Sequence, residues 1–298
     1  MRTGILSQRS IGPTNPNNVS LISERLNDYS LFAHWDFTDH SRLFLTNPIP
    51  VKQIISASNK GTNNIKLETV IQQPDINHSS TQNNYTASSF SINSQDYMYF
   101  SSPLGDTQLN TNNMTIVCVF DLGNNIHTSG SYFFNFNGEY NEDGLDHLSS
   151  YFNLYINSSS KEIIVNMSGS GKGPQAIPYT LKYSTTTTQS YAGEPNDKFN
   201  WFTIVGSADE DHLDLYLRGK KDTQTSYEGT LNHMHIGGDN NEGKINYIGT
   251  YTGSYGFIDS KIYEVIIFNQ SLNTQQLYDI DWYIETKYNY GKGRIFGD

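Results

Sequence analysis

The loop that follows residue 138 holds the residues whose types and spacing best match a metal site. Glu139, Asn141 and Asp143 are separated by single residues and are followed by Gly144. Oxygen-bearing side chains in this alternation partly follow the ligand pattern of a calcium loop. The pattern is incomplete, because the first ligand is not an Asp and Ser150 stands where the bidentate Glu belongs.

A second calcium candidate is Asp239, in the loop Gly-Gly-Asp-Asn-Asn-Glu-Gly over residues 237–243. Asn and Gly also tolerate left-handed backbone, so a plain Gly/Asn turn is the favoured interpretation of both loops. Calcium, with Glu139, Asn141, Asp143 and Asp239 as its ligands, is the alternative. No other cofactor is expected.

No set of residues has the spacing of a catalytic site. A retaining glycosidase needs two carboxylates about 5–5.5 Å apart, and no predicted strand carries a Glu-x-Asp-x-Glu run on one face. The acidic run 209–211 is typical of a solvated hairpin turn, and Cys118 lies in an apolar run that predicts a buried thiol. His233 and His235 share a strand face, for which a polar surface is favoured over a metal site. A Tyr/His/Arg set of the kind a lyase uses stays open.

Composition and charge exclude several classes of protein. The 298 residues carry 19 Lys+Arg against 30 Asp+Glu, a formal net charge of −11 that argues against nucleic-acid binding. An aromatic content of 13% excludes a disordered chain. No stretch approaches the ~20 apolar residues of a spanning helix, and the first residues lack the apolar segment of a secretory signal. We therefore expect neither a membrane segment nor a signal peptide.

Short runs with period-two hydrophobicity predict antiparallel strands. Phe152, Leu154 and Ile156 share one strand face, and so do the leucines of the run 211–218. Three runs are apolar on both faces and predict covered, central strands: 114–120, 201–205 and 263–268. Further strands are expected near 31–37, 51–57, 89–100, 131–136, 162–167, 232–236 and 244–249.

One helix is predicted over residues 273–289. Asn273 is a good N-cap and Gln276 completes a capping-box pair. An apolar stripe follows, formed by Leu277, Ile280, Ile284 and Tyr288. We expect this helix to pack on the edge of a sandwich, with Asp281 and Glu285 on its other face.

The chain thus divides into a polar N-terminal arm over 1–30, an all-β domain over 31–289 with its terminal helix, and a tail over 290–298. The arm is slightly basic, and Arg2 and Arg9 are its predicted partner-docking residues. Many short strands separated by turn residues predict a two-sheet antiparallel jelly-roll sandwich.

Three segments resemble the concanavalin A-like lectin/glucanase (laminin-G-like) jelly-roll superfamily, of the kind found in viral and phage structural proteins. They are the opening run Leu31-Phe-Ala-His-Trp-Asp-Phe-Thr-Asp39, the hairpin 200–219, and the stretch from Met234 to Tyr288. The last segment departs from the family at Ser260, where Gly is common. The resemblance covers most of residues 31–288, and it implies a structural role for Glu264.

Two functions are compatible with this resemblance and with the missing catalytic set. The first is a non-enzymatic virion structural protein, a capsid decoration or fibre module on the particle surface. It would dock on other virion proteins through its arm, bind surface glycans and form a homo-oligomer. The alternative is a soluble carbohydrate-binding lectin domain that uses Tyr and Trp rings as stacking platforms. A polysaccharide hydrolase or lyase is a third, weaker interpretation.

Overall fold

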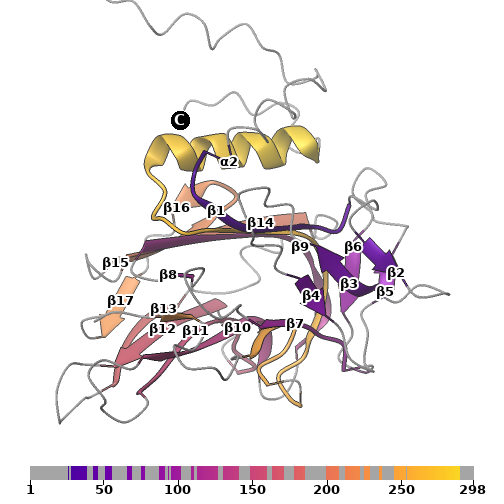
Figure 1. Cartoon of the computed structure of the whole chain (residues 1–298), viewed down its shortest axis with the longest axis horizontal. Coiled ribbons are helices and arrows are strands. Elements are labelled where there is room, and N and C mark those ends of the chain that lie inside the picture. The colour runs from indigo at the N-terminus through magenta and orange to yellow at the C-terminus, as the bar shows by residue number, and fades with distance from the viewer. Residues whose placement is uncertain are drawn as a thin grey trace, which may run out of the picture.

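In the computed structural model of the chain, the described residues are 26, 28–38, 43–45, 51–55, 66–68, 75–77, 87–90, 93, 95–101, 109–110, 113–126, 130–140, 148–159, 163–170, 178–184, 199–207, 212–221, 225–228, 235–236, 245–252 and 254–288. They form three stacked layers: the helix α2 (Thr274–Lys287), a first antiparallel sheet A and a second antiparallel sheet B (Figure 1). The predicted two-sheet, mostly β architecture with a C-terminal helix is confirmed.

Sheet A lies directly beneath α2. Its strands, in spatial order, are β16 (Lys220–Lys221), β15 (His212–Leu217), β14 (Phe199–Ser207), β9 (Asn113–Ile126), β20 (Ile258–Phe268), β6 (Ala87–Phe90) and β5 (Asp75–Asn77). Strand β1 (Leu31–Asp36) also pairs with β20.

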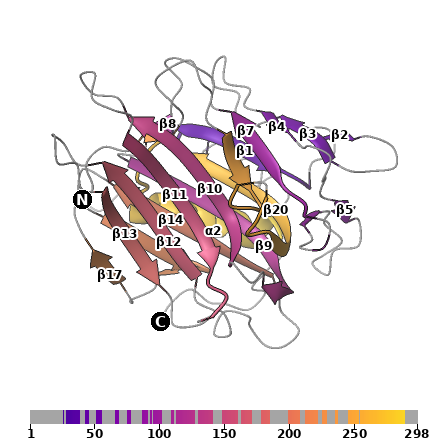
Figure 2. The ribbon, with the colours of Figure 1, turned by 90° about the horizontal axis from the view of Figure 1, so that it is seen from below.

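Sheet B forms the layer farthest from α2, and Figure 2 looks onto its outer face. Its strands, in spatial order, are β17 (Thr225–Glu228), β13 (Pro178–Ser184), β12 (Ile163–Ser170), β11 (Leu148–Ile156), β10 (Ser131–Tyr140), β19 (Ile245–Ile248), β7 (Met98–Ser101), β4 (Lys66–Glu68), β3 (Val51–Ile55) and β2 (Leu43–Leu45). A separate two-stranded sheet pairs β8 (Leu109–Asn110) with β18 (His235–Ile236).

The main hydrophobic core fills the space between the two sheets. It includes Trp35, Phe134, Leu154, Phe202 and Val265, all buried. Leu154 and Ile156 of β11 both belong to it, as their shared face predicts. Cys118 belongs to it too, so the predicted buried thiol is confirmed, and burial raises its pKa.

A second core lies between sheet A and α2. It joins Val117 of β9 and Trp201 of β14 to Ile280 and Ile284 of the helix. The runs predicted to be apolar on both faces are β9, β14 and β20, because one face of each meets the main core and the other meets this second core. The expectation that the helix packs on an edge is therefore wrong: α2 covers a face of the sheet.

The helix begins at the predicted residue, but the set of side chains that face sheet A differs from the prediction. Asn273 accepts hydrogen bonds from the backbone of Gln275 and Gln276, and the capping box with Gln276 is complete. The predicted stripe is buried, and Tyr283 is buried with it. Asp281 does not face away from the sheet as expected, because its carboxylate accepts a 2.8 Å hydrogen bond from the Trp201 indole.

The predicted strand 89–100 is two strands in different sheets. Strand β6 pairs with β20 in sheet A, whereas β7 pairs with β19 in sheet B. The chain crosses between them near Gln95, whose φ of 60° lies in the left-handed region. Residues 1–25 of the predicted arm and the tail 290–298 lie outside the described residues. In the part that the structure describes, no helix is long and apolar enough to cross a membrane.

Candidate functional site

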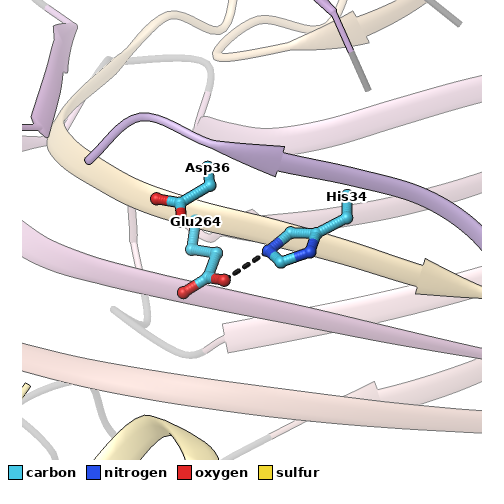
Figure 3. A group of neighbouring side chains, drawn as sticks. All are labelled: His34, Asp36 and Glu264. Carbon is cyan, nitrogen blue, oxygen red and sulfur yellow. Dashed lines mark hydrogen bonds and ion pairs between the residues drawn. The ribbon is translucent and has the colours of Figure 1, made fainter. Parts of the chain in front are cut away.

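Two clusters of side chains qualify for scrutiny, and the first is buried between β1, β20 and α2. Asp36 of β1 lies directly opposite Glu264 of β20 in the antiparallel register. A register shift in the β20–β9 pairing between Ile262 and Glu264 marks a bulge, which aims side chains out of the usual alternation. Figure 3 shows Glu264 in contact with His34. One potential ligand atom of each of His34, Asp36 and Glu264 lies within 4.8 Å of the others.

The last turn of α2 completes this cluster. Lys287 Nζ donates to Asp36 Oδ2 at 2.5 Å and to Glu264 Oε2 at 3.1 Å. Tyr288 donates to Glu264 Oε2 at 2.9 Å, and Tyr283 donates to Oε1 at 2.5 Å. We call these six residues the buried clamp: His34, Asp36, Glu264, Tyr283, Lys287 and Tyr288.

Opposite charges hold the buried clamp ionised. Burial by itself raises the pKa of the Glu264 carboxyl, but the Lys287 ammonium and then the His34 ring outweigh it and lower the pKa to about 2. Burial by itself lowers the pKa of the Lys287 ammonium, but Glu264 and then Asp36 outweigh it and raise the pKa. Because the carboxylate accepts but cannot donate, His34 Nε2 carries the proton in the His34–Glu264 contact.

The buried clamp has the residue types of a metal or catalytic site but not its openness. Both oxygens of Glu264 have two donors each, which fills the capacity of a carboxylate. The Lys287 ammonium occupies the position between Asp36 and Glu264 that a cation would take. Glu264 is 0% exposed, so no substrate reaches it. The cluster therefore joins α2 to sheet A.

The second cluster lies on the outer face of sheet B. The rings of Tyr155 and Tyr132 stack at 4.7 Å and 15°. The Tyr132 ring then meets Tyr251 at 4.9 Å, and Tyr251 meets Tyr255 at 5.0 Å, both tilted. We call these four residues the tyrosine platform. Their rings form one continuous row, and Tyr255 at its end is 41% exposed.

Strand register explains why the first two rings face outward. Tyr132 of β10 pairs with Tyr155 of β11, whereas the next pair, Phe134 with Leu154, is buried in the main core. A register shift between Tyr132 and Phe134 lets Phe133 enter the core as well. Tyr132 is thereby left on the outer face beside its partner.

A short turn after β19 carries the other two rings and holds them in place. Its own backbone closes through Tyr251 N to Tyr255 O at 3.1 Å. Two more bonds fix it on β10: Tyr132 N donates to Gly256 O, and Gly249 N donates to Phe133 O, both at 3.0 Å. The φ of Gly256 is +75°, and a Cβ there would lie 2.7 Å from the Tyr132 ring. Only glycine therefore lets the turn lie this close to the platform.

Asn135 lies at the base of the turn. Its Nδ2 donates to Tyr251 O at 2.5 Å, while its Oδ1 is buried without a hydrogen-bond partner. In the register of sheet B its neighbours are Asn153 of β11 and Tyr247 of β19. Tyr97 contacts Tyr247 at 5.9 Å, so aromatic and amide groups continue on this face beyond the platform.

Stacked, partly exposed tyrosines bind apolar faces of ligands and offer hydroxyl groups at their tips. A pyranose ring has this combination of an apolar face and a polar rim. Because the turn is fixed by backbone hydrogen bonds, little conformational freedom is lost when a ligand lies on the rings. The tyrosine platform is thus chemically suited to bind a saccharide.

Of the metal and docking residues predicted from the sequence, the structure describes only Glu139. Glu139 lies in β10, with its backbone opposite Ser149 of β11. Five of the predicted residues lie outside the described part of the chain, namely Arg2, Arg9, Asn141, Asp143 and Asp239. Calcium binding and the docking arm stay predictions. His235 lies in β18 opposite Asn110, and His233 also lies outside the described residues.

Sequence reasoning missed both clusters, although each left a signal. His34 and Asp36 are two residues apart on a strand and so share one face, and Asp36 lies opposite Glu264. The two outer tyrosines of the platform lie in the turn Tyr251-Thr-Gly-Ser-Tyr-Gly256, which is rich in the residues of a tight loop. The structural role that the resemblance implies for Glu264 agrees with its place in the buried clamp.

Comparisons with known proteins give information on the fold alone. No protein-family model matches the sequence, and no curated protein matches it. Among solved structures, the chain is similar to the binding domain of Paraclostridial Mosquitocidal Protein 1, at 12% identity and a TM-score of 0.55 over 86% of this chain and 52% of that one. It is also similar to the receptor-binding domain of botulinum neurotoxin D, at 14% identity and a TM-score of 0.54 over 86% and 53%.

A third similar structure holds a sugar. It is the ligand-binding domain of botulinum neurotoxin serotype D in complex with N-acetylneuraminic acid, at 14% identity and a TM-score of 0.51 over 89% of this chain and 52% of that one. This chain spans about half the length of the domains it matches. At such identities the likeness establishes a β-sandwich of the type found in toxin binding domains, and it does not carry residues from one protein to the other.

Proposed function

We propose that this chain is a saccharide-binding domain without catalytic activity, and that the tyrosine platform is its binding site. The observation that carries the proposal is the unbroken row of four rings on the outer face of sheet B, three of them half-buried and Tyr255 exposed. Aromatic rings presented side by side on two strands and a fixed turn are suited to a binding surface.

The comparisons support this proposal at the level of fold. The similar solved structures are binding domains, and one of them was solved with a sugar. The buried clamp supports the non-enzymatic part, because Glu264 is 0% exposed and both of its oxygens are already occupied by donors.

A glycan array on three variants tests the proposal. Tyr132→Ala removes the ring that touches two others, and Tyr255→Ala removes the exposed end of the row. The matched control is Tyr278→Ala, because Tyr278 is also 41% exposed but lies on α2. We expect both platform variants to lose about tenfold or more in affinity, since an aromatic contact contributes about 1 kcal/mol or more. The control should bind like the wild type.

The array also separates the platform from the predicted calcium loops. Binding should persist in a chelator if the platform carries it, because the described platform uses rings and amides. Binding that needs calcium would instead favour a site at Glu139, Asn141, Asp143 or Asp239. A folded wild-type chain that retains no glycan would contradict the proposal.

The finer expectations from the sequence also remain proposals. They are the concanavalin A-like jelly-roll assignment, a place on the virion surface and a homo-oligomer. Deleting residues 1–24 tests the docking arm, because unchanged incorporation into particles would count against it.

A further inference from the structure

We infer that the binding surface extends beyond the tyrosine platform and takes a linear oligosaccharide of several linked sugars, with Tyr97 and Tyr247 forming a second subsite. The inference rests on the proposed function and deepens it, because it gives the kind of ligand and two further contact residues.

The second subsite is a pair of rings on the same face of sheet B as the platform. Tyr97 and Tyr247 are half-buried, and their ring centroids lie 5.9 Å apart in an edge-to-face contact. The residues that follow them, Met98 and Ile248, are buried in the main core. Because side chains along a strand alternate between the two faces, both tyrosines face outward.

The second subsite adjoins the turn that carries the platform. Tyr97 packs at 6.4 Å on Phe257, a residue that is 1% exposed and directly follows the turn. Ile258 N donates to Gly249 O at 3.0 Å, which closes the base of the turn. The platform and the second subsite therefore meet at one fixed element and belong to one surface.

The order of the strands gives the length of this surface. Tyr155 lies on β11, Tyr132 on β10 and Tyr247 on β19, and Tyr97 directly precedes β7. These four strands are neighbours in sheet B. Neighbouring strands lie about 4.8 Å apart, so the rings extend over about 14 Å across the sheet. A pyranose ring is about as large as one phenol ring, and a single sugar therefore covers only part of the surface.

Rings that recur along a surface suit a ligand that also repeats. Each sugar of a linear chain presents another apolar face for a ring and another set of hydroxyl groups. Burial raises the pKa of the Tyr97 and Tyr247 phenols, so both hydroxyls stay protonated and can donate to sugar oxygens. Once one sugar is bound, the sugars linked to it meet the remaining rings at a high effective concentration. Affinity should therefore rise with the length of the chain until the rings are covered.

A series of oligosaccharide lengths tests the inference on the full chain. The probes are cello-, malto-, laminari- and chito-oligosaccharides, each from the monosaccharide to the hexasaccharide, titrated by calorimetry. In a series that binds, we expect the tetrasaccharide to bind at least about tenfold more tightly than the monosaccharide. The hexasaccharide should gain less than about twofold more, because its last sugars extend beyond the rings.

Substitutions in the second subsite separate it from the platform. Tyr97→Ala and Tyr247→Ala should each lower the affinity for the tetrasaccharide by about fivefold or more and change that for the monosaccharide by less than about twofold. Tyr97→Phe keeps the ring on Phe257 and should lose no more than about threefold. Tyr278→Ala on α2 is the control and should bind like the wild type. Thermal unfolding shows whether each variant is folded.

The outcomes distinguish the inference from the proposed function. Equal affinity for short and long probes, lost in Tyr132→Ala, would overturn the extended surface and leave the platform as the binding site. A rise with length that persists in both Tyr97→Ala and Tyr247→Ala would overturn the second subsite in the same way. The absence of binding by the folded wild type, in every series and on the glycan array, would overturn both.

Discussion

The buried clamp and the tyrosine platform lie on opposite sides of the same sandwich. The clamp holds the titratable groups, whereas the platform is the cluster that is accessible to solvent. The clamp gathers His34, Glu264 and Lys287, the residue types that catalysis uses most, yet both oxygens of Glu264 are already occupied by donors from within the clamp. The platform consists of four tyrosine rings, of which three are half-buried and Tyr255 is exposed. The contrast teaches that residue type alone does not mark a functional site, because the titratable groups of the clamp bind one another.

Among the substitutions that test this comparison, we expect the largest effect at Glu264. Glu264→Gln keeps the shape of the side chain and removes the charge that faces His34 and Lys287. Removal of one partner from a buried pair should cost about 3–5 kcal/mol of unfolding free energy at neutral pH, measured by urea denaturation. The native state that remains should still bind glycan, because the platform lies on the other sheet.

The sign of the pH dependence checks the same residue. The folded pKa of Glu264, about 2, lies below its ordinary value of 4.5, so its stabilisation is present above pH 4.5 and is lost as the pH falls toward 2. The gap between wild type and variant should therefore narrow in acid. Glu285→Gln on α2 is the control and should change stability by less than about 0.5 kcal/mol. A gap that widens in acid would contradict this account.

Two glycines sharpen the comparison. A Cβ at Gly256 would meet the Tyr132 ring at 2.7 Å, and one at Gly219 would meet the Asp281 carboxylate at 2.6 Å. Both residues have positive φ, so either Ala variant should lose about 1–3 kcal/mol of stability. Only Gly256→Ala should also weaken glycan binding, because it displaces a platform ring. Equal binding by both variants would argue that the rings are not the site.

Asp281 gives the smallest expected effect. Burial raises the pKa of its carboxyl to about 6, against the opposing hydrogen bond from Trp201. A raised folded pKa means that stability is lost as the pH rises through about 6. Asp281→Asn keeps an acceptor for Trp201 and removes this loss. It should be more stable than the wild type by about 1–2 kcal/mol at pH 7.5 and equal to it below pH 4, as read from thermal unfolding.

Much of the fold could be predicted because the signals are local. The apolar runs at Met114–Phe120 and Tyr263–Phe268 are covered on both faces, and Asn273 with Gln276 begins the helix where the capping box places it. The helix face was wrong at Asp281, because a periodic pattern does not show that Trp201 offers a donor there. The strand 89–100 was wrong because hydrophobicity does not reveal a crossing between two sheets.

The two clusters could not be predicted, because each depends on register between distant segments. Asp36 and Lys287 are 251 positions apart, and they meet only because β1 and α2 both pack on β20. The stack of Tyr132 on Tyr155 depends on a strand pairing that places both rings outward. The spacing of His34 and Asp36 and the turn residues around Tyr251 were signals within each segment, but they did not show which distant segment each one meets.

The large sequence separation between Asp36 and Lys287 of the buried clamp affects the order in which the chain folds. The hydrogen bond from Lys287 to Asp36 spans 251 residues, and contacts between such distant positions form slowly. During synthesis, β1 emerges long before α2 exists. Until the helix docks, the apolar side chains of sheet A that it later covers, Val117, Trp201 and Ile266, remain in water. The nascent chain therefore passes through an intermediate with exposed apolar surface that is prone to aggregation. Binding of a chaperone or rapid docking of α2 would protect this surface.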